Sequence, residues 1–478
     1  MLYNSIWLSI LIFIQFSAIV GMLLNNYINS NARLAWIIVI VFLPVFGILL
    51  YLFFGEPWIA RRFRRQAEGT FKKHEWTHAI AANSASATVA DRFRSAFATC
   101  EHISGCPVVA GNHATLTADS NGAIDAMVSD FDKAQETIHI SFYIWLTDNN
   151  GLKIVEALKR AASRGVVCRV VVDAVGSLDL IRSEYWAAME AVGVKLCVSL
   201  KPPVGVSLQS ISRPDLRNHR KIVVVDNQIT YCGSQNCADP QFRIEPKFAP
   251  WVDIMLRFEG PVARQNQFLF ASDWTIEYGE DLSPILDAPL PPVESDGFPA
   301  IAFGTGPMSP KGSMSDAFVA LLNSAEREAV ISTPYFAPDL PLLAAILSCA
   351  RRGVEITLIL PARNDSAVVA AISRAHYAEL LAAHVTLREY HGGLLHAKTL
   401  VVDRSVTLVG SANMDFRSLY LNFENNILLY SDDVSRAVRE RQESYIVSST
   451  LVSLEEVQSR SKARAAFDNL LTIVGPIF

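Results

Sequence analysis

Charged residues are scarce in this 478-residue chain: Asp, Glu, Lys and Arg make up 19% of it, against about 25% in typical globular domains. The 47 acidic side chains slightly outnumber the 42 basic ones, so the net charge is −5 and there is no basic excess to hold a nucleic acid. Gly (24) and Pro (22) are too few for a collagenous or low-complexity chain. Because 51% of the residues are hydrophobic, intrinsic disorder is excluded as well. The apolar excess itself predicts either one large core or a membrane segment.

Cysteine is also sparse and shows no metal-ligand spacing. The seven cysteines are odd in number and scattered along the chain: Cys100, Cys106, Cys168, Cys197, Cys232, Cys237 and Cys349. This usage favours reduced thiols in a cytoplasmic domain over a disulfide framework. We therefore expect no metal site and no cofactor.

The first 32 residues lack charge altogether, since no Asp, Glu, Lys or Arg precedes Arg33. Ser5–Leu24 is almost wholly apolar, and Leu34–Phe54 is a second uncharged run. About 20 apolar residues in a helix span a bilayer core. The sequence thus predicts a transmembrane hairpin over residues 1–60, with helices at about 5–24 and 34–54. A cleaved signal peptide is the alternative for the first run, but a basic n-region is missing.

Basic residues follow the second run closely. Four arginines lie there, Arg61, Arg62, Arg64 and Arg65. The turn between the two runs has only Arg33. By the positive-inside tendency, both termini and the large C-terminal part are expected on the cytoplasmic side.

The remaining chain divides into two halves with the same order of elements. We expect a linker over 61–105, a first domain over 106–282, a Pro-rich linker over 283–295 and a second domain over 296–478. Each half has an apolar strand, a helix, a Gly and a β-branched strand. In the first half the first strand is expected at 138–145, the helix at 152–163 and the second strand at 167–173; in the second half they are expected at 330–335, 342–352 and 355–360. Strand–helix–strand order predicts an α/β fold with mixed sheets covered by helices.

A motif recurs in both halves at a constant offset of 177 residues. The recurring residues are His219, Lys221, Asp226, Gly233, Ser234 and Asn236, matched by His396, Lys398, Asp403, Gly410, Ser411 and Asn413. Six identities in register indicate a duplicated domain.

The spacing within each motif favours phosphodiester chemistry. Residues i and i+2 of a strand share a face, so the imidazole and the ammonium project side by side. Asp226 and Asp403 follow their His by an odd number of residues, which favours a turn or structural role for them. Ser and Asn at the end of the next strand supply neutral donors. A metal site is the competing interpretation, but Lys is not a normal metal ligand.

The pattern His-x-Lys-x4-Asp followed by Gly-Ser-x-Asn resembles the signature of the phospholipase D superfamily, over roughly Gly105 to the C-terminus. Ser332–Asp339 and Asn413–Ser418 are similar to stretches of bacterial cardiolipin synthases with two such motifs. The resemblance implies two duplicated phospholipase D-like domains, each a mixed β-sheet flanked by helices, preceded by the hairpin. It also implies a multi-pass protein of the bacterial inner membrane.

The resemblance further implies a two-step transfer at one site between the halves. His219 would attack phosphorus and form a phosphohistidine, while His396 would act as general acid and then as general base. The implied catalytic set is His219, Lys221, Asp226, His396, Lys398 and Asp403, and the implied phosphate-binding set is Ser234, Asn236, Ser411 and Asn413.

An acid that fixes the tautomer of each imidazole is expected on the strand after Gly-Ser-x-Asn. Glu424 and Asp253 fit that place, each counted from the His of its own half; an ordinary solvated charge is the alternative for either. Tyr143 and Tyr335 end apolar strands and belong either to the pocket or to the core.

The resemblance predicts cardiolipin synthesis: a phosphatidyl group passes from one phosphatidylglycerol to another and glycerol leaves. A membrane-bound hydrolase, or a head-group transferase on another phospholipid, is the alternative, because the same chemistry accepts water or other alcohols. Expected partners are phosphatidylglycerol and the bilayer, without nucleic acid; a homo-oligomer is left open. A membrane-anchored scaffold without enzymatic activity is another alternative. A degenerate site of that kind would be expected to have lost a His, Lys or Asn of the motif, and neither copy has lost one. The C-terminal stretch 460–478 is expected to pack on the second domain, with a membrane-surface role as the alternative.

Overall fold

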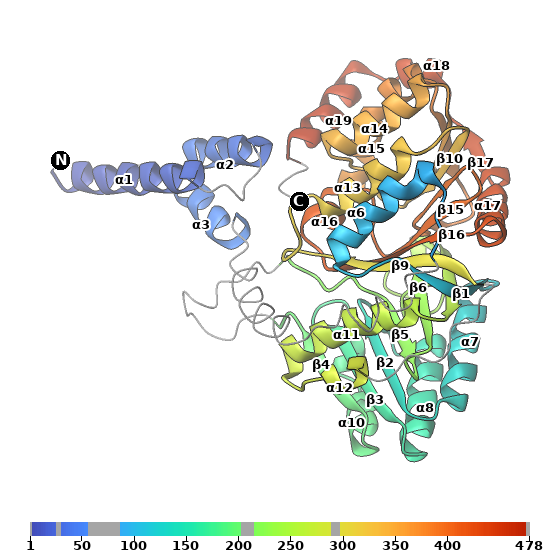
Figure 1. The fold of residues 1–478 in the computed structure, drawn as a ribbon. Coiled ribbons are helices and arrows are strands. Elements are labelled where there is room, and N and C mark those ends of the chain that lie inside the picture. The colour runs from blue at the N-terminus through green and yellow to red at the C-terminus, as the bar shows by residue number, and fades with distance from the viewer. Residues whose placement is uncertain (1, 25–29, 56–86, 202–214, 288–296, 475–478) are drawn as a thin grey trace.

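The computed structural model describes residues 2–24, 30–55, 87–201, 215–287 and 297–474. Figure 1 shows a small helical unit formed by the first three helices beside a large body built from two halves. The Arg cluster 61–65, on which the predicted topology rests, lies outside the described residues.

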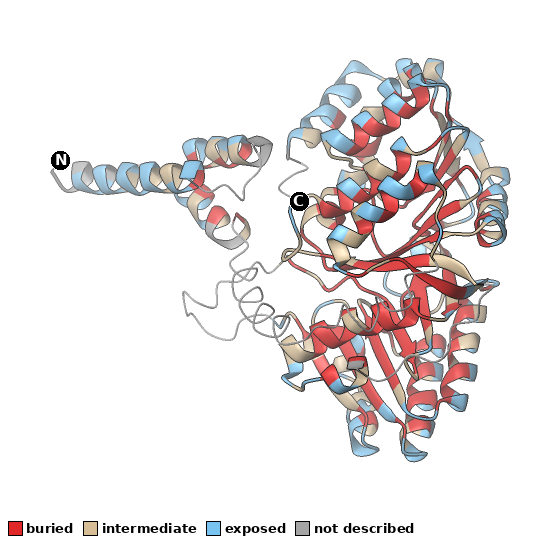
Figure 2. Ribbon diagram, in the orientation of Figure 1, coloured by how far each residue is buried: buried red, intermediate tan, exposed pale blue. Residues whose placement is uncertain are grey.

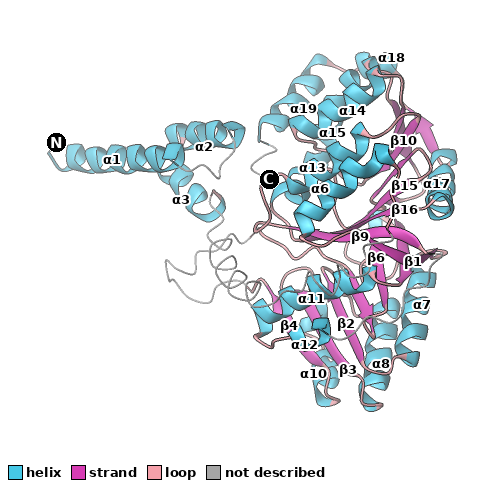
Figure 3. Ribbon diagram, viewed as in Figure 1, coloured by secondary structure: helices cyan, strands magenta, loops and turns pink. Residues whose placement is uncertain are grey.

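One 15-stranded sheet runs through both halves (Figure 3). Its order is β17-β12-β11-β10-β14-β15-β16-β9-β1-β8-β6-β5-β2-β3-β4. The first half contributes β1 (Val109–Leu116), β2 (Thr137–Phe142), β3 (Val167–Asp173), β4 (Lys195–Ser199), β5 (Ile222–Val225), β6 (Ile229–Gly233) and β8 (Met255–Glu259). The second contributes β9 (Phe298–Thr305), β10 (Glu328–Ser332), β11 (Glu355–Pro361), β12 (Thr386–Tyr390), β14 (Thr399–Val402), β15 (Val406–Gly410), β16 (Glu424–Tyr430) and β17 (Ser449–Leu451).

The strand order reads the same outward from the centre in both directions. The two halves meet where β1 pairs antiparallel with β9, and β8, β6, β5, β2, β3 and β4 then match β16, β15, β14, β10, β11 and β12. Parallel pairs such as β2–β3 stand beside antiparallel pairs such as β5–β6. The predicted mixed α/β fold of two duplicated domains is confirmed.

Helices cover both faces of the sheet, so strands such as β5, β14 and β15 are buried along their whole length (Figure 2). The first half has α7 (Ser120–Lys133), α8 (Asn149–Ser163), α9 (Leu178–Ile181), α10 (Glu184–Ala191), α11 (Val262–Tyr278) and α12 (Ser283–Asp287). The second has α13 (Ser313–Asn323), α14 (Leu340–Arg351), α15 (Ala367–Ala382), α16 (Phe416–Tyr420), α17 (Asp432–Val447), α18 (Leu454–Gln458) and α19 (Lys462–Val474).

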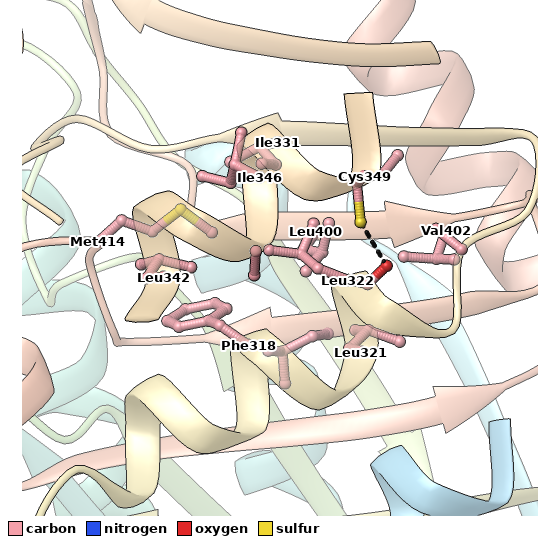
Figure 4. Close-up of a cluster of buried hydrophobic side chains, with 14 of the residues drawn as sticks. Phe318, Leu321, Leu322, Ile331, Leu342, Ile346, Cys349, Leu400, Val402 and Met414 are labelled. Carbon is pink, nitrogen blue, oxygen red and sulfur yellow. Dashed lines mark hydrogen bonds between the residues drawn. The ribbon is translucent and has the colours of Figure 1, made fainter. Parts of the chain in front are cut away.

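The core of the second half lies between the sheet and the pair α13–α14 (Figure 4). Phe318 and Leu321 of α13 and Ile346 of α14 pack on Leu400 of β14. The thiol of Cys349 reaches the carbonyl of Leu322 at 2.8 Å, and all seven cysteines are buried and free. Each deeply buried aliphatic side chain contributes about 1.5–3 kcal/mol.

The range expected as a linker contains a packed helix, α6 (Arg94–Ser104). Phe97 and Cys100 of α6, together with Phe93 just before it, join the core of the second half beside Phe303 of β9. The chain therefore enters the first domain across the surface of the second.

The N-terminal unit differs from the expected hairpin. Its helices are α1 (Leu2–Leu24), α2 (Ser30–Phe42) and α3 (Pro44–Phe54). Pro44 divides the run 34–54, because proline disfavours helical backbone at the residue before it, and Leu43 has φ −127° and ψ 70°. Within the described ranges, no helix combines the length and the apolarity needed to cross a membrane, so the predicted pair of spanning helices is not supported.

Candidate active site

The two motif histidines are held by backbone from the opposite half. His219 lies just before β5, and its N–H donates to the carbonyl of Phe423 at 2.9 Å. His396 lies just before β14, and its N–H donates to the carbonyl of Val252 at 2.8 Å. A short parallel pair of β7 (Trp251–Val252) and β13 (Leu394–Leu395) continues the second contact. Each motif is thus aligned along the other domain.

The two acids pair with the histidines across the halves. Nδ1 of His219 lies 2.9 Å and 3.0 Å from the two carboxylate oxygens of Glu424, and Nδ1 of His396 lies 2.6 Å from Oδ1 of Asp253. Counting within one half had matched Glu424 to His396 and Asp253 to His219, and the structure exchanges these partners. An ionised carboxylate only accepts, so each Nδ1 carries the proton and each Nε2 keeps a lone pair.

The ionisation of the four groups follows from burial and mutual proximity. Burial raises the pKa of Glu424, but His219, Lys221 and Ser411 together outweigh it, so the pKa lies below its ordinary value. The pKa of Asp253 is lowered in the same way by His396, Lys398 and Ser234. Burial lowers the pKa of His219 to about 4 and that of His396 to about 3. Both imidazoles are therefore neutral at pH 7 in the free enzyme.

Lys221 and Lys398 bring positive charge to both imidazoles. The Nζ of Lys221 donates to the carbonyl of His219 at 2.8 Å, and the Nζ of Lys398 donates to that of His396 at 2.7 Å. Burial lowers the pKa of Lys221 to about 8 and that of Lys398 to about 7, against the attraction of both acids. Each lysine also lowers the pKa of the histidine in the other half, which indicates one shared site.

The motif serines hold the acids. Ser234 Oγ donates to Asp253 at 2.6 Å, and Ser411 Oγ donates to Glu424. Each hydroxyl oxygen also accepts the backbone N–H of the residue after its acid. Ser234 accepts from Ile254 at 3.0 Å, and Ser411 accepts from Asn425 at 2.9 Å. The hydroxyls predicted to bind phosphate therefore support the carboxylates.

The motif asparagines are buried beside the histidines. Asn236 Oδ1 accepts the N–H of Ile144 at 3.2 Å, an orientation that leaves its amide N–H groups as donors. Asn413 Oδ1 has no partner among the described residues. Both side chains remain candidates for a phosphate oxygen.

Asp226 and Asp403, the acids of the implied catalytic set, lie at turns and accept backbone N–H groups. Asp226 accepts the N–H groups of residues 135–137 at 2.8 Å, and Asp403 accepts those of residues 326–328 at 2.8–3.1 Å. Their backbone is left-handed, with φ +48° and +51°, as a tight turn requires and Asp tolerates. These carboxylates fasten the β5–β6 and β14–β15 turns to the strands β2 and β10.

Three further side chains contact the site, and two of them, Ser418 and Trp251, had no assigned role in the sequence. Ser418 Oγ gives Glu424 another donor at 2.8 Å, the ring of Trp251 lies 4.6 Å from that of His396, and Tyr143 lies 5.1 Å from His219. Tyr143 thus faces the site. Trp251 and Ser418 stand within or beside the stretches that carry the resemblance, which was the available signal.

Arg220, between the motif His and Lys, is buried and joins the halves. Its guanidinium donates to Asp273 at 2.6 Å and to the carbonyl of Glu424 at 3.2 Å. Ala397 occupies the equivalent position in the second motif. The two motifs therefore have different supports.

Comparisons with known proteins agree with this geometry. The family described as cardiolipin synthase, PLD-like domain matches residues 127–247 and 318–446, and the phospholipase D-nuclease N-terminal family matches 6–56. Cardiolipin synthase A of Yersinia pseudotuberculosis and that of Yersinia pestis are each 35% identical over 98% of both chains. The crystal structure of phosphatidylserine synthase from Haemophilus influenzae has a TM-score of 0.60 at 13% identity, covering 80% of this chain and 100% of its own.

Fold and site together define a phosphatidyltransferase of the phospholipase D type. The chain belongs to the family of phospholipase D-like cardiolipin synthases.

Proposed function

We propose that cardiolipin synthesis proceeds through a phosphohistidine at the composite site, with two phosphatidylglycerol molecules as donor and acceptor. The observation that carries this proposal is the pair of crossed His–carboxylate contacts, His219 with Glu424 and His396 with Asp253. Each contact leaves an Nε2 lone pair available, as a nucleophile and a general base both require.

In the first step, Nε2 of His219 attacks phosphorus and the bond from phosphorus to the glycerol oxygen breaks. His396, protonated when the anionic substrate is bound, gives its Nε2 proton to the departing glycerol oxygen. A bound phosphodiester favours this protonation because a nearby negative charge raises the pKa of an imidazole.

In the second step, the neutral Nε2 of His396 takes a proton from a hydroxyl of the second phosphatidylglycerol. The resulting alkoxide attacks phosphorus, the bond from phosphorus to His219 breaks, and cardiolipin forms. Lys221, Lys398, Asn236 and Asn413 stabilise charge on the remaining phosphate oxygens. Ser234 and Ser411 act indirectly, through the carboxylates that they hold.

Membrane association follows from the family, and we propose that the N-terminal unit provides it. Among the large side chains that α1 exposes are Trp7, Phe13 and Phe16, which are 64–70% exposed. An apolar surface of this kind suits the lipid side of a membrane interface. Placement on the cytoplasmic face of the inner membrane is part of this proposal.

The test is a product assay with the full-length protein and phosphatidylglycerol vesicles. Cardiolipin and glycerol are expected in equal amounts, and His219→Asn and His396→Asn should each abolish both. His113→Asn, at an exposed position on β1, is the matched control and should retain activity. Phosphatidic acid in place of cardiolipin would refute the synthase and establish the hydrolase.

A further inference from the structure

The last helix, α19, leaves most of its apolar side chains exposed and buries an acidic one. Asp468 is buried against α15, where its carboxylate pairs with Arg374 at 3.2 Å. Phe467, Leu470 and Ile473 are 54%, 57% and 60% exposed. A helix that rests on a globular domain normally buries its apolar stripe, so α19 has the opposite arrangement.

The exposed side chains form one stripe. They lie at helical spacing along one face: Ala463, Ala466, Phe467, Leu470 and Ile473. An outward apolar stripe of this length marks a contact surface, because isolated exposed side chains would not follow the helical period.

Positive charge accompanies the stripe. Arg460, Lys462 and Arg464 precede or begin the helix, and Asp468 is the acid of residues 460–474. Asp468 pairs with Arg374 at 3.2 Å and with Arg464 at 3.3 Å, so Arg460 and Lys462 supply the positive charge beside the stripe. An apolar stripe with basic flanks matches an anionic phospholipid surface.

The position of α19 agrees with a lipid partner. Figure 1 shows α19 on the side of the large body where α1–α3 lie, together with α16, which follows Asn413 of the active site. Figure 2 shows the outer surface of α19 exposed. Helix α17 lies on the opposite side in the same view.

We propose that the α19 stripe is a second contact with the surface of an anionic phospholipid bilayer, separate from the N-terminal unit. Its apolar side chains enter the head-group region to a depth of about 5–10 Å. This contact orients the large body so that the active site faces the lipids that it consumes. The proposal rests on the lipid substrate of the proposed function, but its main test requires no turnover.

The main experiment labels the full-length Leu470→Cys variant with a polarity-sensitive fluorophore. Because all seven native cysteines are buried, the label goes to the new thiol. Vesicles of phosphatidylglycerol and phosphatidylcholine should shift the emission to the blue, and quenchers on the acyl chains should reduce it. Val447→Cys on α17, 78% exposed, is the matched control and should show neither change.

Two results would overturn the proposal. One is an emission at residue 470 that vesicles leave unchanged, or that shifts no more than at residue 447. The other is a blue shift without vesicles that grows with protein concentration, which would identify a second copy of the chain as the partner.

A second variant connects the stripe to activity. Leu470→Glu should lower the rate on vesicle-borne phosphatidylglycerol about tenfold and leave the rate on detergent-dispersed substrate unchanged; equal losses in both would contradict the proposal. If the proposed function itself fails, no cardiolipin forms in either assay, while the fluorescence result still stands.

Discussion

The crossed pairing of acids and histidines leads to a specific prediction for Glu424→Gln. Glu424 accepts from Nδ1 of His219 at 2.9 Å and from Ser418 at 2.8 Å, and Ser411 also donates to it. Glutamine keeps the volume of this side chain and one acceptor oxygen but removes the charge. Because the side chain is fully buried, water does not replace the lost interaction.

The expected loss follows from hydrogen-bond energies. A bond to a charged group contributes about 1.5–3 kcal/mol and one between neutral groups about 0.5–1.5 kcal/mol, so the substitution costs about 1–2 kcal/mol wherever His219 is cationic. At about 1.4 kcal/mol per factor of ten, cardiolipin formation should slow about 5- to 30-fold.

The pH profile gives an independent readout of the same substitution. The negative charge of Glu424 raises the pKa of Lys221, which burial has lowered to about 8. Without that charge the pKa of Lys221 falls further, and the lysine loses its proton at lower pH. The alkaline limb of kcat should therefore move to lower pH in Glu424→Gln if protonated Lys221 is required.

The assay is cardiolipin formation in phosphatidylglycerol vesicles from about pH 6 to about pH 9, combined with acid-safe trapping of the phosphoenzyme. Glu424→Gln should form the phosphohistidine slowly, because it weakens the support of the nucleophile His219. Asp253→Asn, its counterpart beside His396, should impair proton transfer instead. A Glu424→Gln enzyme with the native rate and pH profile, or one whose defect is coupled to His396 rather than His219, would refute the crossed assignment.

The remaining predictions concern the supports around the site. Asp226→Ala and Asp403→Ala should each lower the free energy of unfolding by about 1–3 kcal/mol, since backbone donors lose their acceptor. The kcat per folded molecule should stay near the native value. Thermal unfolding measures the first effect and vesicle kinetics the second, and a large loss of kcat at native stability would support a catalytic role. Arg220→Ala should cost about 3–5 kcal/mol, because it leaves the buried Asp273 unpaired. The double variant Arg220→Met/Asp273→Leu should recover most of that loss in denaturant unfolding, and no recovery would show that the ion pair is not the cause.

The parts of the fold that could be predicted are those encoded by local pattern. The 177-residue repeat put the two His-x-Lys motifs at equivalent positions of a strand, and each motif leads into one, β5 or β14. Apolar runs and a Gly after the helix predicted β2–α8–β3 and the equivalent β10–α14–β11. A strand that is buried on both faces has a continuous run of hydrophobic residues, which is visible in the sequence. His–Lys proximity followed from the period of a strand.

The parts that could not be predicted depend on where distant segments meet. Glu424 and Asp253 were recognised as candidates, but the sequence holds nothing that tells which His each one faces. The exchange depends on the central β1–β9 pairing, which brings the edge of one half against the other. The Ser234 and Ser411 hydroxyls each turn to the acid of their own half, and this direction depends on the packing of neighbouring strands. Pro44 was a visible signal, and its effect on the run 34–54 was underestimated.

The near-symmetry of the halves is itself an argument about mechanism. Displacement at phosphorus is in line when the attacking and leaving groups lie on opposite sides, and the proposed mechanism requires that the two matched domains bring one histidine to each side of the phosphate. Perfect symmetry would make the histidines interchangeable, yet Arg220 faces Asp273 where the other motif has Ala397. Glu424 also accepts from two hydroxyls, those of Ser411 and Ser418, while Ser234 is the hydroxyl that donates to Asp253. The greater number of supports around the His219–Glu424 pair favours His219 as the nucleophile of the proposed mechanism, because the covalent phosphatidyl group would remain in place while glycerol leaves and the second lipid enters.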